Sequence, residues 1–277
     1  MQETIQLLPI LKYPGGKTKL VLVLKKYYDL HRDRRFVAPF CGGLGDVLGL
    51  MPRTALLNDR FPALINLYRK VKEGFTIKNP IQHSDRAYYL ARDRFNTISV
   101  PLMLPFYSQE AAELLIYLNR HCFNGLIRAN SMGGFNTPVG KPPRGQDFKY
   151  PLDYQEYVGV FKNWEFTCQD FSQVEVLDSD FAYLDPPYDE LSKTSSFTQY
   201  GTGEPFDWAR QEELAYLASK YPCPTLASNH ATDRIVDLYT KLGASIEYVS
   251  VSRAINSKIS ARSDKVVEIL ASWRIQK

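Results

Sequence analysis

The chain has 277 residues, of which 44% are hydrophobic and 23% are charged, and its formal net charge is +4. These values fit an ordinary soluble globular protein with room for one sizeable α/β domain that carries an insert, or for two small domains. No apolar run approaches the roughly 18 residues that span a bilayer, and no signal-peptide pattern opens the sequence, so we expect a cytoplasmic protein without a membrane partner.

The first 60 residues have the pattern of the start of an α/β sheet. Gly15 and Gly16 predict a turn, and apolar residues at helical spacing predict a helix over 18–30. A buried strand is expected over 35–40, and it leads into the glycine-rich stretch 41–45. The next expected elements are a helix over 46–51 and a strand over 55–58, which ends at Asp59; Pro62 then lies near the start of another helix.

The middle of the chain differs from both ends. Helical patterns at 85–95 and 109–119 are followed by residues 135–145, which are rich in turn formers and poor in core material. Further strands are expected at 165–169, 181–184, 225–228, 246–251 and 266–272, with helices at 208–220 and 232–242. Strands separated by helices predict a parallel sheet covered on both faces, and the last two strands should pair as an antiparallel hairpin. We therefore expect one sheet built from residues 1–62 and 155–277, and a mostly helical lobe inserted at 63–154.

The predicted strand 181–184 is followed by Asp185-Pro186-Pro187-Tyr188. Ligands of open α/β sheets bind beyond the carboxyl ends of the strands, where this tetrapeptide falls. Two prolines fix the backbone, so the Asp185 carboxylate and the Pro186 carbonyl become two acceptors in a rigid corner beside the Tyr188 ring. An exocyclic amine such as adenine N6 offers two N–H donors and an aromatic face, which match this set. The structural alternative is a proline-rich turn in which Asp185 only caps a helix.

A cofactor side is predicted at neighbouring strand ends. The first strand ends in Phe40-Cys41-Gly42-Gly43-Leu44-Gly45, where small residues let the backbone approach a bound nucleoside. Asp59 is expected to accept ribose hydroxyls, or else to be an exposed helix cap. Gln169-Asp170, at the end of another strand, could contact the adenine of a cofactor. Tyr13 and Lys17 could bring a ring and a cation to the same place, or belong to an ordinary surface loop.

Residues 120–144, here called the basic segment, have the composition of a DNA-binding surface. They contain no acidic residue but carry Arg120, His121, Arg128, Lys141 and Arg144, interleaved with Phe123, Phe135, Asn124, Asn130 and Asn136. Cations suit phosphates, Arg and Asn can pair with base edges, and an aromatic ring can enter a base stack. Adenine N6 cannot be reached inside a duplex, so the base must flip out, and Phe123 is a candidate to fill the gap. A solvated basic loop is the alternative.

These motifs, in this order, resemble the Dam-like family of DNA adenine-N6 methyltransferases over nearly the whole chain. That family has an aromatic-x-Gly-Gly-Lys start, a Phe-x-Gly-x-Gly loop, a target-recognition insert and then Asp-Pro-Pro-Tyr; residues 122–128 and 134–141 also resemble its insert. The resemblance implies a Rossmann-like class I methyltransferase fold, S-adenosylmethionine as methyl donor and double-stranded DNA as partner. Three positions depart from the family: Tyr13 replaces a tryptophan, Ala38 an acid, and Leu44 the second glycine of the loop.

The resemblance also implies roles for single residues. The expected catalytic set is Asp185, Pro186, Pro187 and Tyr188. The expected cofactor contacts are Tyr13, Lys17, Phe40, Gly42, Gly43, Asp59, Asp170 and Asp185, of which the glycine-loop residues and Asp170 rest on their positions at strand ends. The expected DNA contacts are Lys12, Phe123, Asn124, Leu126, Arg128 and Pro138, to which the charge of the basic segment adds Lys141. The similar insert makes GATC the expected recognition sequence, and we expect a monomer.

Other functions remain open at this point. The same chemistry could act on cytosine N4, RNA or a protein amide, although Asp at position 185 and the basic segment favour adenine in duplex DNA. A catalytically silent DNA-binding relative would keep the fold, but the intact 185–188 motif argues against it. A nucleotide hydrolase is disfavoured because no Gly-Lys-Ser/Thr follows the glycines. No metal is expected, because four single cysteines and four histidines show no metal-ligand spacing.

Overall fold

A seven-stranded sheet forms the centre of the computed structural model, which describes residues 7–13, 18–99, 108–130, 133–142, 148, 150–189, 206–252 and 265–275. The strand order is β3-β2-β1-β4-β5-β7-β6. The strands are β1 (Arg35–Ala38), β2 (Ala55–Asn58), β3 (Trp164–Thr167), β4 (Asp180–Leu184), β5 (Thr225–His230), β6 (Ser245–Ser252) and β7 (Lys265–Trp273). Neighbours among β1 to β5 pair in parallel, whereas β7 is antiparallel to both β5 and β6. The predicted mostly parallel, Rossmann-like sheet and its C-terminal antiparallel hairpin are therefore confirmed.

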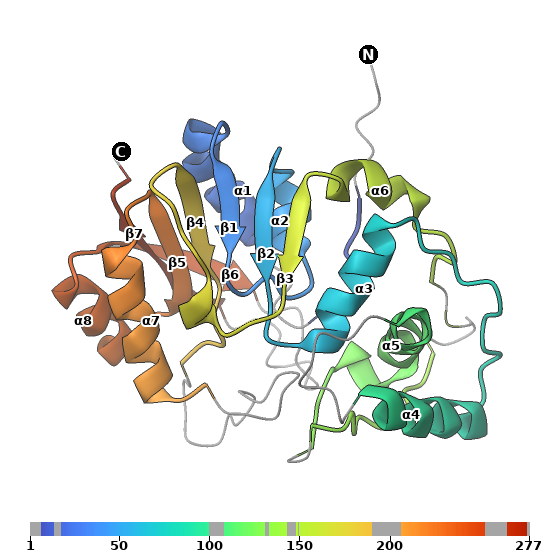
Figure 1. Ribbon diagram of the computed structural model, residues 1–277. Helices are drawn as coiled ribbons and strands as arrows, with labels where there is room; N and C mark the ends of the chain where they lie inside the picture. The colour runs from blue at the N-terminus through green and yellow to red at the C-terminus, as the bar shows by residue number, and fades with distance from the viewer. Residues whose placement is uncertain are drawn as a thin grey trace.

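Helices cover both faces of the sheet, as the near-continuous burial of the central strands requires. Alternate residues of β4 face opposite ways: Phe181 and Tyr183 join one core cluster, and Ala182 and Leu184 join another. The first cluster includes side chains of α1 (Thr18–Tyr28), α2 (Gly45–Leu50) and α3 (Pro62–Lys72), and the second includes those of α7 (Trp208–Lys220) and α8 (Asp233–Lys241). In Figure 1, α7 and α8 lie in front of the sheet beside β5, whereas α1 and α2 lie behind it.

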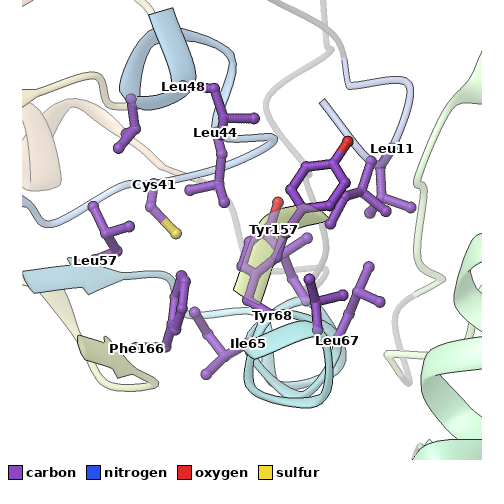
Figure 2. Packing of buried hydrophobic residues seen from close by; sticks show 14 of the residues in the cluster. Leu11, Cys41, Leu44, Leu48, Leu57, Ile65, Leu67, Tyr68, Tyr157 and Phe166 are labelled. Carbon is purple, nitrogen blue, oxygen red and sulfur yellow. The ribbon is translucent and has the colours of Figure 1, made fainter. Parts of the chain in front are cut away.

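Helix α3 connects the sheet to the helices of the middle of the chain. On one side, Lys72 donates to the Trp164 carbonyl (2.6 Å) and Arg69 donates to the Phe166 carbonyl, which ties α3 to β3. On the other side, the Asn66 side chain exchanges two hydrogen bonds with the backbone of Ser108, the N-cap of α5 (Gln109–His121). Figure 2 shows Ile65, Leu67 and Tyr68 of α3 beside core residues of the sheet and Tyr157 of α6.

The remaining elements of this region are α4 (Asp85–Ser99), η2 (Phe123–Gly125) and α6 (Gln155–Phe161), and 3₁₀ turns η1 (Asp29–His31) and η3 (Phe171–Gln173) lie elsewhere. Helix α5 lies beside α3, and α4 lies beside α5, both away from the sheet (Figure 1). The predicted elements are present with shifts at their ends, and α5 continues to His121 instead of ending at residue 119. The division into residues 63–154 and the two flanking segments stays a prediction.

No helix among the described residues is both long enough and apolar enough to span a membrane. Nor do they group three His, Cys, Asp or Glu side chains in a way that could hold a metal ion.

Candidate functional site at the carboxyl edge of the sheet

Three predicted segments end up at one edge of the sheet because β2, β1 and β4 are parallel neighbours. The register pairs Ala38 with Leu57 and Val37 with Ala182, so the carboxyl ends of the three strands lie side by side. The glycine turn 41–45 follows β1, Asp59 follows β2, and the corner 185–188 follows β4. We call these three segments the sheet edge.

The glycine turn is held by hydrogen bonds on both sides. Gly42 has φ +45°, in the left-handed region that glycine adopts without strain. Its N–H donates to Asp59 Oδ2 (3.0 Å), and its carbonyl accepts from the buried Tyr68 hydroxyl (2.6 Å). The second carboxylate oxygen of Asp59 accepts from the Phe61 N–H at 2.9 Å. The turn after β1 and the acid after β2 therefore form one rigid unit.

Tyr13 packs directly on this turn. A Cβ added at Gly43 would lie 2.4 Å from Tyr13 Cβ, and one added at Gly42 would lie 3.2 Å from Tyr13 Cε1. Contacts this short require glycine at position 43, so the predicted aromatic residue does lie at the predicted loop. Lys17, together with residues 14–16, lies outside the described residues.

Leu44 adopts a backbone conformation that usually belongs to glycine. Its φ is +60°, and it occupies the position at which the Dam-like family has its second glycine. A left-handed non-glycine residue costs about 1 kcal/mol or more. The side chain is only 1% exposed, and full burial of a leucine contributes about 2 kcal/mol. Burial therefore offsets the strain, and the loop keeps its glycine-like shape without the glycine.

The Asp59 carboxylate is held in place at the sheet edge by two backbone hydrogen bonds. Burial raises its pKa to about 6, although the N–H groups of Phe61 and Gly42 lower it. Both N–H groups orient the carboxylate beside the turn on which Tyr13 lies. The ribose-binding role that the sequence suggests for Asp59 stays a prediction.

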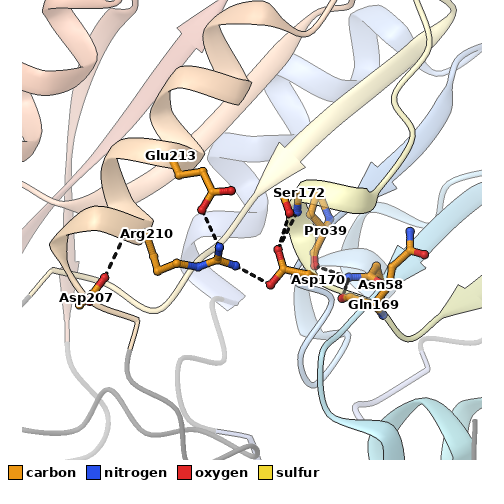
Figure 3. Close-up of polar contacts among 8 residues, drawn as sticks. All are labelled: Pro39, Asn58, Gln169, Asp170, Ser172, Asp207, Arg210 and Glu213. Atoms are coloured by element: carbon orange, nitrogen blue, oxygen red, sulfur yellow. Dashed lines mark hydrogen bonds and ion pairs between the residues drawn. The ribbon is translucent and has the colours of Figure 1, made fainter. Parts of the chain in front are cut away.

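The side chain of Asp170 is held from two directions (Figure 3). Its Oδ1 accepts from the backbone N–H (3.0 Å) and the hydroxyl (2.7 Å) of Ser172, and its Oδ2 accepts from Arg210 of α7. Burial alone would raise the pKa of Asp170, but the hydrogen bonds from Arg210 and Ser172 lower it to about 2. The Arg210 guanidinium also lies 4.3 Å above the Phe171 ring, which packs 5.3 Å from the ring of Phe40. Phe40 and Asp170 thus belong to one cluster clamped by Arg210, which the sequence did not suggest.

Asn58 links the same cluster to the glycine turn. Its side-chain amide donates to the carbonyls of Pro39 and Gln169, both at 3.0 Å, and its oxygen accepts from the Gln169 N–H (Figure 3). The last residue of β2 therefore fixes the segments that follow β1 and β3.

The corner 185–188 is anchored on the neighbouring strand β5 and on α7. Asp185 is half-buried, and its Oδ1 accepts from the Ser228 hydroxyl at 2.8 Å. Farther along, the Pro187 carbonyl accepts from the Gln211 side chain at 2.8 Å. Asn229 accepts from the backbone N–H of Asp189 at 3.0 Å and donates to Gln211 at 3.0 Å. The corner is therefore held through the side chain of Asp185 at one end and through the backbone of Pro187 and Asp189 at the other.

The Tyr188 ring is oriented by two strands. It meets the His230 ring edge-to-face at 4.9 Å, and its hydroxyl donates to Glu268 Oε2 at 3.3 Å. Just beyond it, the buried Asp189 carboxylate pairs with Arg234 and accepts from Thr232. The polar run Ser228-Asn229-His230 at the end of an apolar strand was the signal that could have revealed these supports in the sequence.

The described part of the basic segment presents exposed side chains on a rigid base. Its ends are joined by the hydrogen bonds Phe123 N–H to Pro138 O (2.9 Å) and Gly140 N–H to His121 O (2.7 Å). Phe123 is 49% exposed although it is aromatic. The other predicted DNA contacts Asn124, Arg128, Pro138 and Lys141 are exposed too, and Leu126 is half-buried.

Lys12 connects the basic segment to the glycine turn. Its backbone exchanges hydrogen bonds with the Asn119 side chain, at 2.8 and 2.7 Å, and a Cβ at Gly125 would lie 2.5 Å from Lys12 Cβ. Lys12 therefore lies against Gly125, whereas the next residue, Tyr13, lies on Gly43. The predicted DNA-contacting and cofactor-contacting residues of the segment 7–13 are thus adjacent.

Three residues of the basic segment do not have the exposure that the sequence interpretation gave them. Arg120 donates to the carbonyls of Pro9 and Ile10. His121 is buried, its Nδ1 lies 2.7 Å from the Tyr117 carbonyl oxygen, and burial lowers its pKa to about 4. Phe135 is also buried. These three side chains support the fold instead of facing DNA, and Arg144 lies outside the described residues.

Comparison with known proteins gives a consistent family. Residues 13–255 match the D12 class N6 adenine-specific DNA methyltransferases. The DNA adenine methylase of Serratia marcescens is 34% identical, and the alignment covers 95% of this chain and 97% of that methylase. A type II methyltransferase of Lactococcus lactis subsp. cremoris is 31% identical, and the alignment covers 98% of this chain and 97% of the relative. The DNA adenine methylase of Escherichia coli (strain K12) is also 31% identical, over 95% of this chain and 94% of the relative. With its glycine turn, its acid after β2 and its Asp-Pro-Pro-Tyr corner at one sheet edge, the chain belongs to the D12 class of N6-adenine-specific DNA methyltransferases.

Proposed function

We propose that the corner 185–188 holds an adenine that has been flipped out of duplex DNA while its N6 is methylated. S-adenosylmethionine supplies the electrophilic methyl group when it is bound. The observation that carries the proposal is the shared sheet edge: the corner after β4 lies beside the glycine turn after β1, its parallel neighbour. This arrangement supports binding of the methyl donor and the acceptor amine next to each other, at the carboxyl ends of neighbouring strands.

In this proposal, the Asp185 carboxylate and the Pro186 carbonyl accept the two N6 hydrogens. Two fixed acceptors direct the nitrogen lone pair toward the methyl group and stabilise the positive charge that develops as the C–N bond forms. Tyr188 stacks on the adenine, and its ring is held in orientation by His230 and Glu268. The C–N bond would form as the methyl–sulfur bond of the sulfonium breaks, a neutral thioether would leave, and the extra proton on N6 would be lost to solvent. Direct transfer of this kind requires no covalent enzyme intermediate.

The methyl donor would be held by the residues around the glycine turn. Asp59 would accept ribose hydroxyls, Tyr13 would stack, and Gly42 and Gly43 would allow close approach of the backbone. Phe40 and Asp170 would contact the adenine end, and Lys17 and Asp185 complete the proposed set. The short contacts between Tyr13 and the two glycines and the oriented Asp59 carboxylate support this assignment.

The lobe formed by residues 63–154 would bind the DNA. The proposed contacts are Lys12, Phe123, Asn124, Leu126, Arg128, Pro138 and Lys141, and Phe123 would fill the gap left by the flipped base. Exposure of these side chains, apart from the half-buried Leu126, supports the proposal. GATC is the recognition sequence that the resemblance of the insert suggests, and a monomer is the proposed active form.

The direct test is the rate of methyl transfer by Asp185→Ala, measured with tritiated S-adenosylmethionine and duplex DNA. We expect a loss of at least about a hundredfold in kcat with DNA affinity retained, because a positioned acceptor is removed. Asp178→Ala is the matched control, since this exposed carboxylate precedes β4 at the opposite edge of the sheet. Near-normal turnover by Asp185→Ala contradicts the proposal.

The sequence specificity needs a separate experiment. A plasmid methylated in vitro by the wild-type protein and sequenced by a methylation-sensitive method would map every N6-methyladenine. Methylation confined to GATC supports the proposed site, and any other consistent context replaces it. Parallel reactions with RNA and with DNA that lacks adenine in the target context test the substrate class.

A further inference from the structure

We propose that Ser228 is a positioning residue for methyl transfer: its buried hydroxyl links Tyr183 to Asp185 and fixes the rotation of the Asp185 carboxylate. The inference rests on the proposed role of Asp185 as an acceptor for adenine N6. It adds a residue from β5, a strand that none of the sequence motifs points to.

The sheet register brings the two residues together. Strands β4 and β5 are parallel, with Leu184 opposite Ala227, so the next residue on each strand, Asp185 and Ser228, also lie side by side. Ser228 is completely buried. Its Oγ lies 2.8 Å from Asp185 Oδ1 and 3.0 Å from the Tyr183 hydroxyl, while the Leu184 carbonyl is farther away at 3.5 Å.

The direction of these hydrogen bonds follows from the chemistry of the groups. An ionised carboxylate can only accept, and a serine hydroxyl has a single hydrogen to donate. Ser228 must therefore give its hydrogen to Asp185, so its oxygen accepts from Tyr183. Burial raises the pKa of Tyr183 well above its usual value, which keeps the phenol protonated as the first donor of the chain. The order is Tyr183 to Ser228 to Asp185.

The consequence concerns the terminal torsion of Asp185. Rotation about the bond to a carboxylate has a broad energy profile, so the side chain of a half-buried aspartate does not fix its own oxygens. Methyl transfer requires the acceptor oxygens to stay within a fraction of an ångström of the productive position. A donor from the buried sheet, bonded at 2.8 Å, supplies that constraint, whereas the proline backbone fixes only the main chain.

The test compares kcat and KM of four variants. Ser228→Ala should lower kcat at least about tenfold and leave the KM values for DNA and S-adenosylmethionine within about twofold, since acceptor orientation acts on the transition state. Tyr183→Phe should lower kcat by about threefold, because Ser228 keeps its own hydrogen. Ser228→Thr, which retains the hydroxyl, should recover most of the activity per folded molecule.

Ser272→Ala is the matched control: Ser272 is a buried serine on β7 whose hydroxyl contacts the Ser245 carbonyl, and its loss should leave kcat unchanged.

The outcomes separate this inference from the proposed function. A kcat of Ser228→Ala equal to wild type, beside an inactive Asp185→Ala, overturns the inference and leaves the proposed function intact. Near-normal Asp185→Ala overturns both. If kcat falls only in proportion to the folded fraction seen by circular dichroism, Ser228 is structural and the inference is wrong. Should Ser228→Ala not fold, Ser228→Cys, with a much weaker donor of similar shape, must show the loss instead. In the double variant, Ser228→Ala should add nothing to Asp185→Ala.

Discussion

The sheet edge and the basic segment differ in how firmly their side chains are held. At the sheet edge, backbone and side chains are both held: the corner 185–188 has partners on β5, β7 and α7. In the basic segment the backbone is held through hydrogen bonds between its ends and isolated bridges such as Ala129 with Phe135, and the side chains of Arg120 and His121 are held at the end of α5. Most of its predicted DNA contacts are exposed, and Leu126 is half-buried. Acceptors for a reacting amine must already be in place, whereas side chains that meet DNA must be able to adjust to it.

The largest effect is expected at Gly43, where an added side chain would overlap Tyr13. Gly43→Ala would place a methyl group 2.4 Å from Tyr13 Cβ, so the tyrosine must leave the turn. We expect the affinity for S-adenosylmethionine to fall by about 30-fold, which corresponds to about 2 kcal/mol of overpacking. Isothermal titration calorimetry measures it. Gly159→Ala is the control, because nothing lies within 4 Å of a Cβ there and the residue is helical. Equal affinities of the two variants would show that the turn is not part of the cofactor site.

Phe123→Ala tests the other half of the comparison. An exposed ring that enters the base stack contributes to DNA binding and to flipping but not to folding, so we expect kcat/KM for DNA to fall about tenfold with an unchanged Tm. Tyr216→Ala removes a ring of similar exposure on α7 and should change neither quantity. A lower Tm for Phe123→Ala would mean that the ring supports the fold. A fluorescent adenine analogue in the target reports flipping directly.

Most of the fold could be predicted because it depends on local patterns. Strands and helices follow from periodicity, and their alternation implies the parallel sheet and hence the common edge for Gly42, Asp59 and Asp185. The errors in the basic segment have a local cause. Helix α5 continues through Arg120 and His121, so these cations belong to a packed helix end and not to a loop. Charge counting along the sequence could not detect this, because two extra residues of helix decide which way the side chains point.

The supports of the site were harder to predict because they come from other strands. Ser228 meets Asp185 only through the register of β5 on β4, and Arg210 meets Asp170 only because α7 packs against η3, the turn that follows Asp170. Neither pair has a fixed spacing in the sequence. A polar side chain at the end of an apolar strand is the only sign of such a role, and many such residues merely end a strand.

A pair of arginine variants should separate the two kinds of cation within the basic segment. Arg128 is exposed and donates to Asn136 Oδ1 at 2.7 Å, so Arg128→Ala should weaken DNA binding about fivefold without changing Tm. Arg120 holds the carbonyls of Pro9 and Ile10, so Arg120→Ala should lower Tm. Fluorescence anisotropy at two salt concentrations, with thermal melts, measures both. The prediction is wrong if the two variants have the same effects.

The smallest effect is the pH dependence of cofactor binding. The carboxyl of Asp59 has a pKa of about 6, so it is ionised above that pH and protonated below it. Ribose hydroxyls donate to the ionised form, so affinity for S-adenosylmethionine should rise with pH through 6 and level off above 7. Between pH 7.5 and 5.5 the ionised fraction falls about fourfold, and the affinity should fall by the same factor.

Asp59→Asn provides the control for this titration, because it keeps the shape of the side chain but has no proton to lose. Protonation of the ligand and of other residues affects both proteins, so the difference between their calorimetric affinities isolates Asp59. We expect that difference to shrink as the pH falls from 7.5 to 5.5, since the wild-type carboxylate is then lost as well. A difference that is constant over this range would show that Asp59 does not accept the ribose hydroxyls. Its two bonds to the Gly42 and Phe61 N–H groups would then be its whole role, as a clamp between β1 and β2.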